Sequence, residues 1–399
     1  MTVPAHPPTG PIHAPTPRLV LHIGAGKSGS SAIQAALKLN ASALRGRGFL
    51  VPDISLGVSG LVEGRQVRFF EATRAMGTSG SGVLAARLDG LRQAMARDGL
   101  HTVLVSAENL VNASSMAAML NEASTGFQAS AIAYVRRQDE YLAAAWAQWA
   151  CKVNRAPFDA WVAAQAGRAA NWETTVSRWE REAPNIPLTV RVFERDRLVG
   201  RDVVRDYLSL LGNDLRDLPP PADPMNVSLN ELGACICWKN QRMFKGAHDS
   251  RFSDFVRALG KDLVLRPVSA LPRWSAPDRR ALMRRYEASN ERLRMRRFPA
   301  LPPGSLFLPV ADDVRPRLEP DDMVRCEAQL LSDALGVRVP IDEVARMWPV
   351  AFARHLARGR PDAGDEPVPQ APHDRAGVVR PIAALKRWLL RPGSEPPAM

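Results

Sequence analysis

The chain has 399 residues and a formal net charge of +12, and 46% of its residues are hydrophobic. This length is enough for one large domain or two ordinary ones, and no run of about 18 or more apolar residues predicts a transmembrane helix. The positive charge comes mostly from arginine and suits an anionic partner such as a nucleotide, an acidic glycan, a nucleic acid or a lipid headgroup, without selecting one of them.

Several common signals are absent from the sequence. Residues 1–17 are rich in Pro and Thr and lack the apolar segment of a secretory signal, so we expect a disordered tail on a cytoplasmic protein. The histidines are scattered, without HxH or HExxH. The cysteines do not have the spacing of a zinc site or a thioredoxin-type pair; they are Cys151, Cys235, Cys237 and Cys326. We therefore expect no metal.

Apolar strands alternate with helical patterns between residues 18 and 215. Strands are expected in "RLVLHIG" from residue 18, "RGRGFLVPD" from 45, "HTVLVSAENL" from 101, "ASAIAYV" from 129 and "NIPLTVRVF" from 185. Short continuous apolar runs suit strands that are covered on both faces. Helices are expected after residue 30, over 81–99 and over 200–211, the last closed by Gly212. This order predicts an α/β fold with a P-loop-type parallel β-sheet flanked by helices.

The chain after residue 215 has a different character. Prolines at 219–224 mark a break, and residues 216–348 have mostly helical patterns, such as "DRRALMRRYEASNERLRMRR". We expect a helical extension that completes the domain. Residues 349–399 are expected to form a C-terminal tail, with a Pro-rich linker and a short basic amphipathic helix at 381–392. That helix would either contact an anionic membrane or dock on the body of the protein.

The first strand runs into a Gly-rich stretch, "HIGAGKSGSS", at residues 22–31. Gly26, Lys27 and Ser28 form the end of a Walker A loop, but the earlier glycine of that signature is replaced by Leu21. The physical parts of an anion site are nevertheless present: a helix N-terminus, glycines for close backbone approach, a lysine and several hydroxyls. The loop is therefore expected to hold a phosphate-like group.

The stretch "HIGAGKSGSSAIQAAL" resembles the loop that binds the 5′-phosphosulfate in PAPS-dependent sulfotransferases. PAPS is 3′-phosphoadenosine-5′-phosphosulfate. The pattern of that family, K-[ST]-G-[ST]-[ST], is matched at each place by Lys27, Ser28, Gly29, Ser30 and Ser31. The resemblance implies that these residues and Gly26 hold the 5′-phosphosulfate, and that Lys27 also serves catalysis.

A second element of that family binds the 3′-phosphate with an arginine after a strand and a serine eight residues later. "AIAYVRRQDEYLAAAW" is similar to it, in the form found in bacterial carbohydrate sulfotransferases. Arg136 takes the place of the arginine, and Arg137 follows it. The place of the serine is Ala144, so one expected hydroxyl is missing. The resemblance implies that Arg136 and Arg137 bind the 3′-phosphate by charge-assisted hydrogen bonds.

Glu108 is the candidate catalytic base. It follows the strand in "VLVSAENL", and a carboxylate at the carboxyl edge of a parallel strand faces the crevice where open α/β sheets bind ligands. The family resemblance implies a base at this place, where carbohydrate sulfotransferases often use a carboxylate. His22 is the next candidate, although its position inside the first strand favours a packing role.

The resemblance extends from about residue 18 to about residue 307 and includes "MNVSLNELG" and "RRYEASNERL". It implies a sulfotransferase that moves a sulfuryl group from PAPS to an acceptor hydroxyl of a carbohydrate or glycolipid, without a metal. Catalysis of this kind depends on positioning and charge stabilisation. Contact with a membrane through residues 381–392 would fit a glycolipid acceptor.

Three other readings stay open. A P-loop kinase or NTPase would use the same loop with ATP and Mg²⁺, although Glu108 stands where a Walker B aspartate is expected. A non-catalytic nucleotide-binding protein of the same fold would explain Ala144. Nucleic-acid binding rests on charge alone, because no interleaving of aromatic and basic residues supports it, and we expect no nucleic-acid partner.

Overall fold

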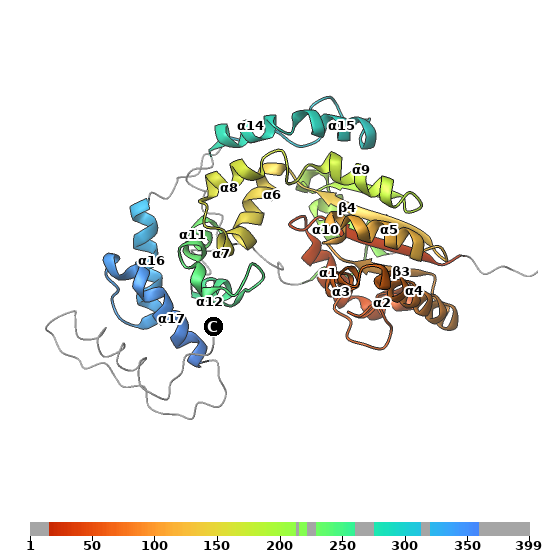
Figure 1. Ribbon diagram of the computed structural model, residues 1–399, viewed down its shortest axis with the longest axis horizontal. Helices are drawn as coiled ribbons and strands as arrows, with labels where there is room; N and C mark the ends of the chain where they lie inside the picture. The colour runs from red at the N-terminus through yellow and green to blue at the C-terminus, as the bar shows by residue number, and fades with distance from the viewer. Residues whose placement is uncertain (1–15, 213–214, 222–228, 260–274, 313–319, 359–399) are drawn as a thin grey trace, which may run out of the picture. The chain divides into compact units, whose positions relative to one another are not determined.

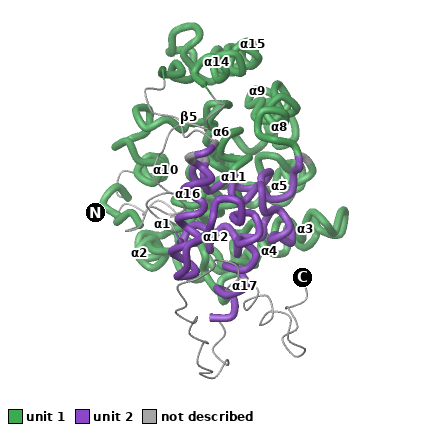
Figure 2. The backbone as a smooth tube through the Cα atoms, turned by 90° about the vertical axis from the view of Figure 1, so that its left-hand side faces the viewer, with its two compact units in different colours: residues 1–147, 156–228, 273–315 green, residues 148–155, 229–272, 316–399 purple. Residues whose placement is uncertain are grey.

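The computed structural model describes residues 16–212, 215–221, 229–259, 275–312 and 320–358 (Figure 1). The helix predicted at 381–392 and nearly all of the predicted N-terminal tail lie outside these residues. The described chain forms two compact units, each built from separate segments (Figure 2). The first combines residues 1–147, 156–228 and 273–315, and the second combines 148–155, 229–272 and 316–399. Both therefore take segments from either side of the boundary predicted at residue 215.

The first unit contains a five-stranded, all-parallel sheet in the order β2-β3-β1-β4-β5. The strands are β1 (Arg18–Gly24), β2 (Phe49–Leu50), β3 (Thr102–Ser106), β4 (Gln128–Val135) and β5 (Leu188–Val192). β1 is central and nearly all of its residues are buried, as expected from its continuous apolar run. The predicted parallel α/β fold is confirmed.

Helices cover both faces of the sheet, so that the unit has three layers. Alternate residues of the strands point to opposite faces. Leu19 and Leu21 of β1 pack in one core and Val20 packs in the other. The first core is covered by α3 (Val67–Ala75), α4 (Thr78–Asp98), α5 (Ser114–Ala123) and α9 (Trp172–Glu182). The second is covered by α1 (Ser30–Leu39), α2 (Ala41–Gly46) and α10 (Val203–Leu211).

The direction of the connections defines a topological switch point at the carboxyl edge of the sheet, the place where open α/β sheets have their ligand crevice. From β1 the chain passes to β2 at one edge, and from β4 it passes to β5 at the other edge. β1 and β4 are neighbours, so their carboxyl ends flank a topological switch point. Open α/β sheets bind their ligands at such a point. The segments that follow β1 and β4 are the two in which the sequence places its anion-binding residues.

The other helices of the first unit are α6 (Gln138–Ala145), α8 (Phe158–Gln165), α14 (Ala276–Arg284) and α15 (Glu287–Arg297). Leu293 of α15 and Phe307 after it belong to the core that α9 covers. Single helical turns lie at Leu110–Asn112, Arg195–Arg197 and Val199–Arg201. A π-helical turn, Trp146–Ala150, continues α6 across the boundary into the second unit. Residues far along the chain thus complete the sheet unit.

The second unit is helical in its described part. It contains α7 (Cys151–Val153), α11 (Glu231–Lys239), α12 (Arg251–Leu259), α16 (Pro320–Leu335) and α17 (Val344–Arg358), with turns at Gln241–Met243 and Ile341–Glu343. Phe252 packs edge-on against Trp348 and Phe352. Buried Glu327 accepts hydrogen bonds from Lys239 and from the Trp348 indole. None of the described helices is both long and apolar enough to cross a membrane.

Candidate functional site

The loop between β1 and α1 has a backbone that only glycine fits at one position. β1 ends at Gly24 and α1 begins at Ser30, as the sequence predicts. Gly29 precedes the helix with a φ of 84°. A Cβ atom at Gly29 would lie 2.8 Å from the Phe193 ring and 2.9 Å from Val203. The positive φ and these contacts both exclude a side chain, so Gly29 sets the direction in which α1 leaves the loop.

The N-terminus of α1 is open to an anion. No side chain caps it, and its first turn contains no acidic residue. The hydroxyl of Ser30, the natural candidate for a cap, instead donates to the Ala25 carbonyl at 3.1 Å. The first N–H groups of a helix have no intrahelical acceptor and lie at the positive end of its dipole. This end of α1 can therefore bind a phosphate or sulfate group.

Ser28 supplies a second sign of a ligand. Its side chain is fully buried, and the Oγ atom has no hydrogen-bond partner in the described part of the protein. A buried hydroxyl without a partner costs about 1–3 kcal/mol. An anion at the start of α1 would supply the missing acceptor. Lys27 beside it is half-buried and has a φ of 66°, while Ser31 is half-buried on the first turn of α1.

Arg136 connects the two sides of the crevice. Its Nη1 atom donates to the Lys27 carbonyl at 2.9 Å, and its Nε atom donates to Glu140 at 3.1 Å. The guanidinium carbon lies 5.6 Å from the centre of the Phe193 ring. The Arg136 carbonyl accepts from the Trp172 indole at 2.7 Å. The segment after β4 is thus joined to the loop after β1, as the pairing of the two predicted phosphate elements requires.

Arg137 points elsewhere, although it was predicted beside Arg136 in the phosphate site. Its guanidinium donates to Asp139 at 2.7 Å and to the carbonyls of Leu308 and Pro309 at 3.1 and 3.3 Å. Burial would lower the pKa of Arg137, but the hydrogen bond and charge of Asp139 outweigh burial and raise the pKa. Asp139 also accepts from Arg279 at 2.7 Å. The described contacts of Arg137 hold the segment after α15 and do not reach the loop after β1.

Glu108 lies two residues after β3, at the same edge of the sheet. Its side chain is half-buried, and its Oε2 atom accepts a hydrogen bond from Gln34 of α1. The Glu108 backbone packs directly on the end of β1, because a Cβ at Gly24 would lie 2.4 Å from the Glu108 carbonyl oxygen. The structure therefore brings Glu108 next to both the end of β1 and helix α1.

His22 is inside the first unit rather than in the crevice. It is fully buried, its Nδ1 atom lies 2.7 Å from the Ser106 hydroxyl, and its ring contacts the edges of Tyr134 and Tyr207. Burial lowers the pKa of His22 to about 3. A neutral ring packed among aromatic side chains matches the packing role expected for this residue.

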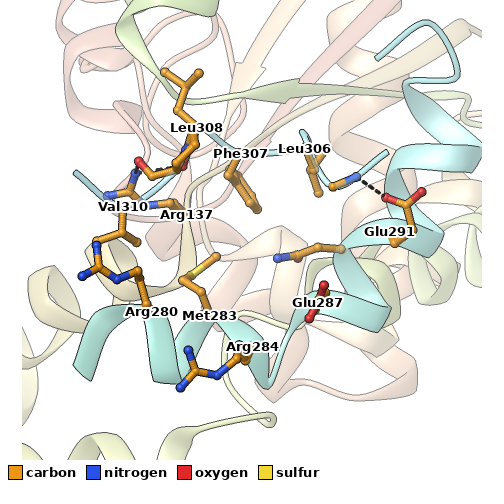
Figure 3. Close-up of a pocket in the computed structure, with 13 residues that line it drawn as sticks. Arg137, Arg280, Met283, Arg284, Glu287, Glu291, Leu306, Phe307, Leu308 and Val310 are labelled. Atoms are coloured by element: carbon orange, nitrogen blue, oxygen red, sulfur yellow. Dashed lines mark hydrogen bonds between the residues drawn. The ribbon is translucent and has the colours of Figure 1, made fainter. Parts of the chain in front are cut away.

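A pocket of about 350 Å³ lies beside Arg137, between α14, the start of α15 and the segment that follows α15 (Figure 3). Its apolar lining consists of Met283, Leu306, Phe307, Leu308, Pro309 and Val310. Its polar lining consists of Arg137, Arg280, Arg284, Glu287, Asn290 and Glu291, and Gly304 also borders it. Arg280 pairs with Asp312 at 2.8 Å. The pocket thus brings apolar and charged side chains together.

Three residues near the site carry no signal in the sequence. Gln34 reaches Glu108, and Phe193 lies between Arg136 and Gly29. Gln66 accepts from the Ser106 N–H at 3.0 Å and ties the segment before α3 to the end of β3. Each lies at the carboxyl edge of the sheet because of a contact between segments that are far apart in the sequence. Only Phe193, at the end of the strand predicted from residue 185 and directly after the observed β5, stands where a pattern could have placed it.

The described residues contain no group of three or more His, Cys, Asp or Glu side chains that could hold a metal ion. Comparison of the chain with protein-family models, with curated proteins and with solved structures finds no match in any of the three. A function for this chain must therefore be inferred from its own residues and not from a relative.

Proposed function

We propose that this protein is a P-loop-type sulfotransferase that moves a sulfuryl group from PAPS to a hydroxyl of a carbohydrate or glycolipid. The proposal rests on one observation above all. At the switch point, the loop that leads to the uncapped N-terminus of α1 and contains the buried Ser28 hydroxyl is hydrogen-bonded, through the Lys27 carbonyl, to the arginine that follows β4. A nucleotide with phosphates at both its 5′ and 3′ positions needs two anion sites, which this loop and Arg136 would supply.

The loop would hold the 5′-phosphosulfate. The N–H groups of α1 and the hydroxyls of Ser28 and Ser31 would donate to its oxygens, and Lys27 would neutralise the charge that develops on the leaving phosphate oxygen. Gly26 allows the backbone to approach closely. Because these donors are fixed by the fold, they need little reorganisation when charge shifts during transfer.

Arg136 would hold the 3′-phosphate. Its guanidinium is already fixed against the loop through the Lys27 carbonyl and against α6 through Glu140. The remaining N–H groups of the Arg136 guanidinium have a planar arrangement that suits hydrogen bonding to a phosphate. Ala144 lies half-buried on α6, where the family resemblance places a serine hydroxyl. The 3′-phosphate would therefore depend more strongly on Arg136 than it does in a site that has this serine.

Glu108 would act as the general base. The acceptor oxygen forms a bond to sulfur, the bond between sulfur and the 5′-phosphate oxygen breaks, and the acceptor proton passes to Glu108 while PAP, the desulfonated nucleotide, is released. PAPS supplies the sulfuryl group together with its leaving group. General-base catalysis typically contributes about 10²–10⁴-fold. We expect Glu108→Gln to bind PAP normally and to transfer more slowly by about that factor.

The acceptor would enter from the same edge of the sheet. The pocket beside Arg137 is lined by apolar side chains together with arginine and carboxylate side chains (Figure 3). Such a lining suits the mixed apolar and hydroxyl-bearing surface of a sugar or glycolipid headgroup. The choice of a carbohydrate acceptor comes from the resemblance of the loop and the segment after β4 to carbohydrate sulfotransferases.

Release of PAP from PAPS in the presence of a panel of glycans and glycolipids tests the reaction. Acceptor-dependent release of PAP by the wild type, reduced in Glu108→Gln, is expected. Two alternatives give different results. A kinase or NTPase would consume ATP–Mg²⁺ and leave PAPS intact, and a non-catalytic nucleotide-binding protein would bind PAP without transfer to any acceptor.

A further inference from the structure

The side chain of Glu108 accepts a hydrogen bond from a residue for which the sequence suggests no function. Gln34 lies on α1, 5% exposed, and its Nε2 atom donates to the Glu108 Oε2 atom. No other hydrogen bond joins the Glu108 side chain to the described residues, so its Oε1 atom remains available. One carboxylate oxygen is thus fixed and the other is left to accept a proton.

Both partners are held by the backbone. Gly64, with a φ of 67°, packs so closely on α1 that a Cβ there would lie 2.1 Å from the Gln34 carbonyl oxygen. On the other side, the Ala107 N–H donates to the His22 carbonyl at 2.9 Å and extends the ladder between β1 and β3 to the residue before Glu108. The side-chain contact therefore joins two fixed points, and a change of rotamer on either side would break it.

The position of Gln34 on α1 links Glu108 to the anion loop. Gln34 is four residues after Ser30, the first residue of the helix, which corresponds to about 6 Å along the helix axis. The same helix therefore presents its N-terminus to the anion loop and its Gln34 amide to Glu108. A displacement of about 1 Å between reacting groups can cost about 10²-fold in rate. One rigid helix that fixes both keeps their separation constant.

We propose that Gln34 is the positioning residue of Glu108: it orients the carboxylate so that Oε1 faces the acceptor hydroxyl at the sulfuryl donor held by the α1 N-terminus. This inference rests on the proposed sulfotransferase function. It assigns no proton transfer to Gln34 itself, which acts only through Glu108.

Gln34→Met tests the assignment because methionine keeps the length and much of the volume of the side chain but cannot donate. We expect kcat for PAP release to fall by about 10- to 100-fold, while the KM for PAPS and the Kd for PAP stay within about twofold of wild type. Gln93→Met is the matched control. Gln93 also donates to a carboxylate, that of Asp89 on α4, at 2.6 Å, but on an exposed helix face. It should leave kcat unchanged.

A double-mutant cycle with Glu108→Gln separates positioning from a structural role. If Gln34 acts through Glu108, adding Gln34→Met to Glu108→Gln should cost little further rate. Three results would each overturn the inference. The first is a loss of rate in the double mutant equal to the product of the two single losses, the second is a wild-type kcat in Gln34→Met, and the third is a fall in PAP affinity as large as the fall in kcat. Gln34→Asn, whose amide is one methylene too short to reach Glu108, should lose kcat similarly and provides the measurement if Gln34→Met does not fold. A wild type that binds PAP but releases none from PAPS would instead overturn the proposed reaction.

Discussion

Arg136 donates a hydrogen bond from Nη1 to the Lys27 carbonyl at 2.9 Å, across the crevice between the carboxyl ends of β4 and β1. The two residues are far apart in the sequence, and each belongs to one of the two predicted phosphate-binding elements. Their contact joins the two segments that the sequence predicts to bind phosphate. It also makes the geometry of the loop depend on the residue that would bind the 3′-phosphate.

Arg136→Ala should weaken PAP binding more than AMP binding, because AMP lacks the 3′-phosphate. A hydrogen bond to a charged group contributes about 1.5–3 kcal/mol, so the affinity for PAP should fall about 10- to 100-fold. Titration of the variant with both nucleotides gives the comparison. Equal losses for PAP and AMP would mean that Arg136 only shapes the loop and does not contact the 3′-phosphate.

Ala144→Ser should strengthen PAP binding by restoring the hydroxyl that the resemblance places on α6. A single added hydrogen bond is worth about 0.5–1.5 kcal/mol, which corresponds to about a 2- to 10-fold lower Kd. Ala143→Ser is the matched control, since Ala143 is also half-buried on α6. The prediction fails if both serines have the same effect, or if AMP binding improves as much as PAP binding.

Gly29→Ala should destabilise the protein and weaken PAP binding together. The left-handed backbone alone costs a residue with a Cβ about 1–2 kcal/mol, and the overlap with Phe193 and Val203 adds to this cost. Urea unfolding measures the loss of stability. Gly90→Ala, in α4 with open space around it, should instead be neutral or stabilise by about 0.5–1 kcal/mol. Normal stability and PAP affinity in Gly29→Ala would contradict the loop geometry.

His22 should make stability fall as the pH falls. Burial lowers its pKa to about 3 from an ordinary value of 6.5, so between these values the unfolded chain binds a proton that the folded protein does not. Stability then rises with pH in this range and is lost below about pH 6.5, by up to about 1.4 kcal/mol per pH unit. Urea unfolding at about pH 5 and pH 7 should show a smaller difference in His22→Gln than in wild type. Equal differences would exclude His22 as the cause.

The sequence predicts the sheet and the loop well because both depend on local patterns. The apolar run of β1 favours a strand that is buried on both faces. The change to Gly and Ser residues from Gly24 onward ends that strand regardless of which neighbours it has in the sheet. The same local logic places Ser30 at the start of α1. Resemblance then supplied the expectation for the ligand, which remains a proposal.

The other features depend on contacts between distant segments. Two consecutive arginines follow β4, and the sequence does not show that Arg136 faces the loop while Arg137 holds the Leu308 carbonyl. The buried state of Ser28 and the contact of Gln34 with Glu108 also arise only when the sheet forms. The two units are not separated by a single boundary in the sequence, because residues 148–155 belong to the second unit and residues 273–315 belong to the first.

The central claim is that the loop after β1 binds a phosphosulfate nucleotide, and calorimetric titration with PAP and with ATP–Mg²⁺ tests it most directly. We predict saturable binding of PAP, no comparable binding of ATP–Mg²⁺, and at least about a 10-fold loss of PAP affinity in Lys27→Ala with an unchanged melting temperature. Lys38→Ala, which removes a lysine of α1 that lies far from the loop in the last turn of the helix and pairs with Glu63 at 2.8 Å, should bind PAP as the wild type does. Saturable binding of ATP–Mg²⁺ without binding of PAP, or normal PAP affinity in Lys27→Ala, would contradict the claim.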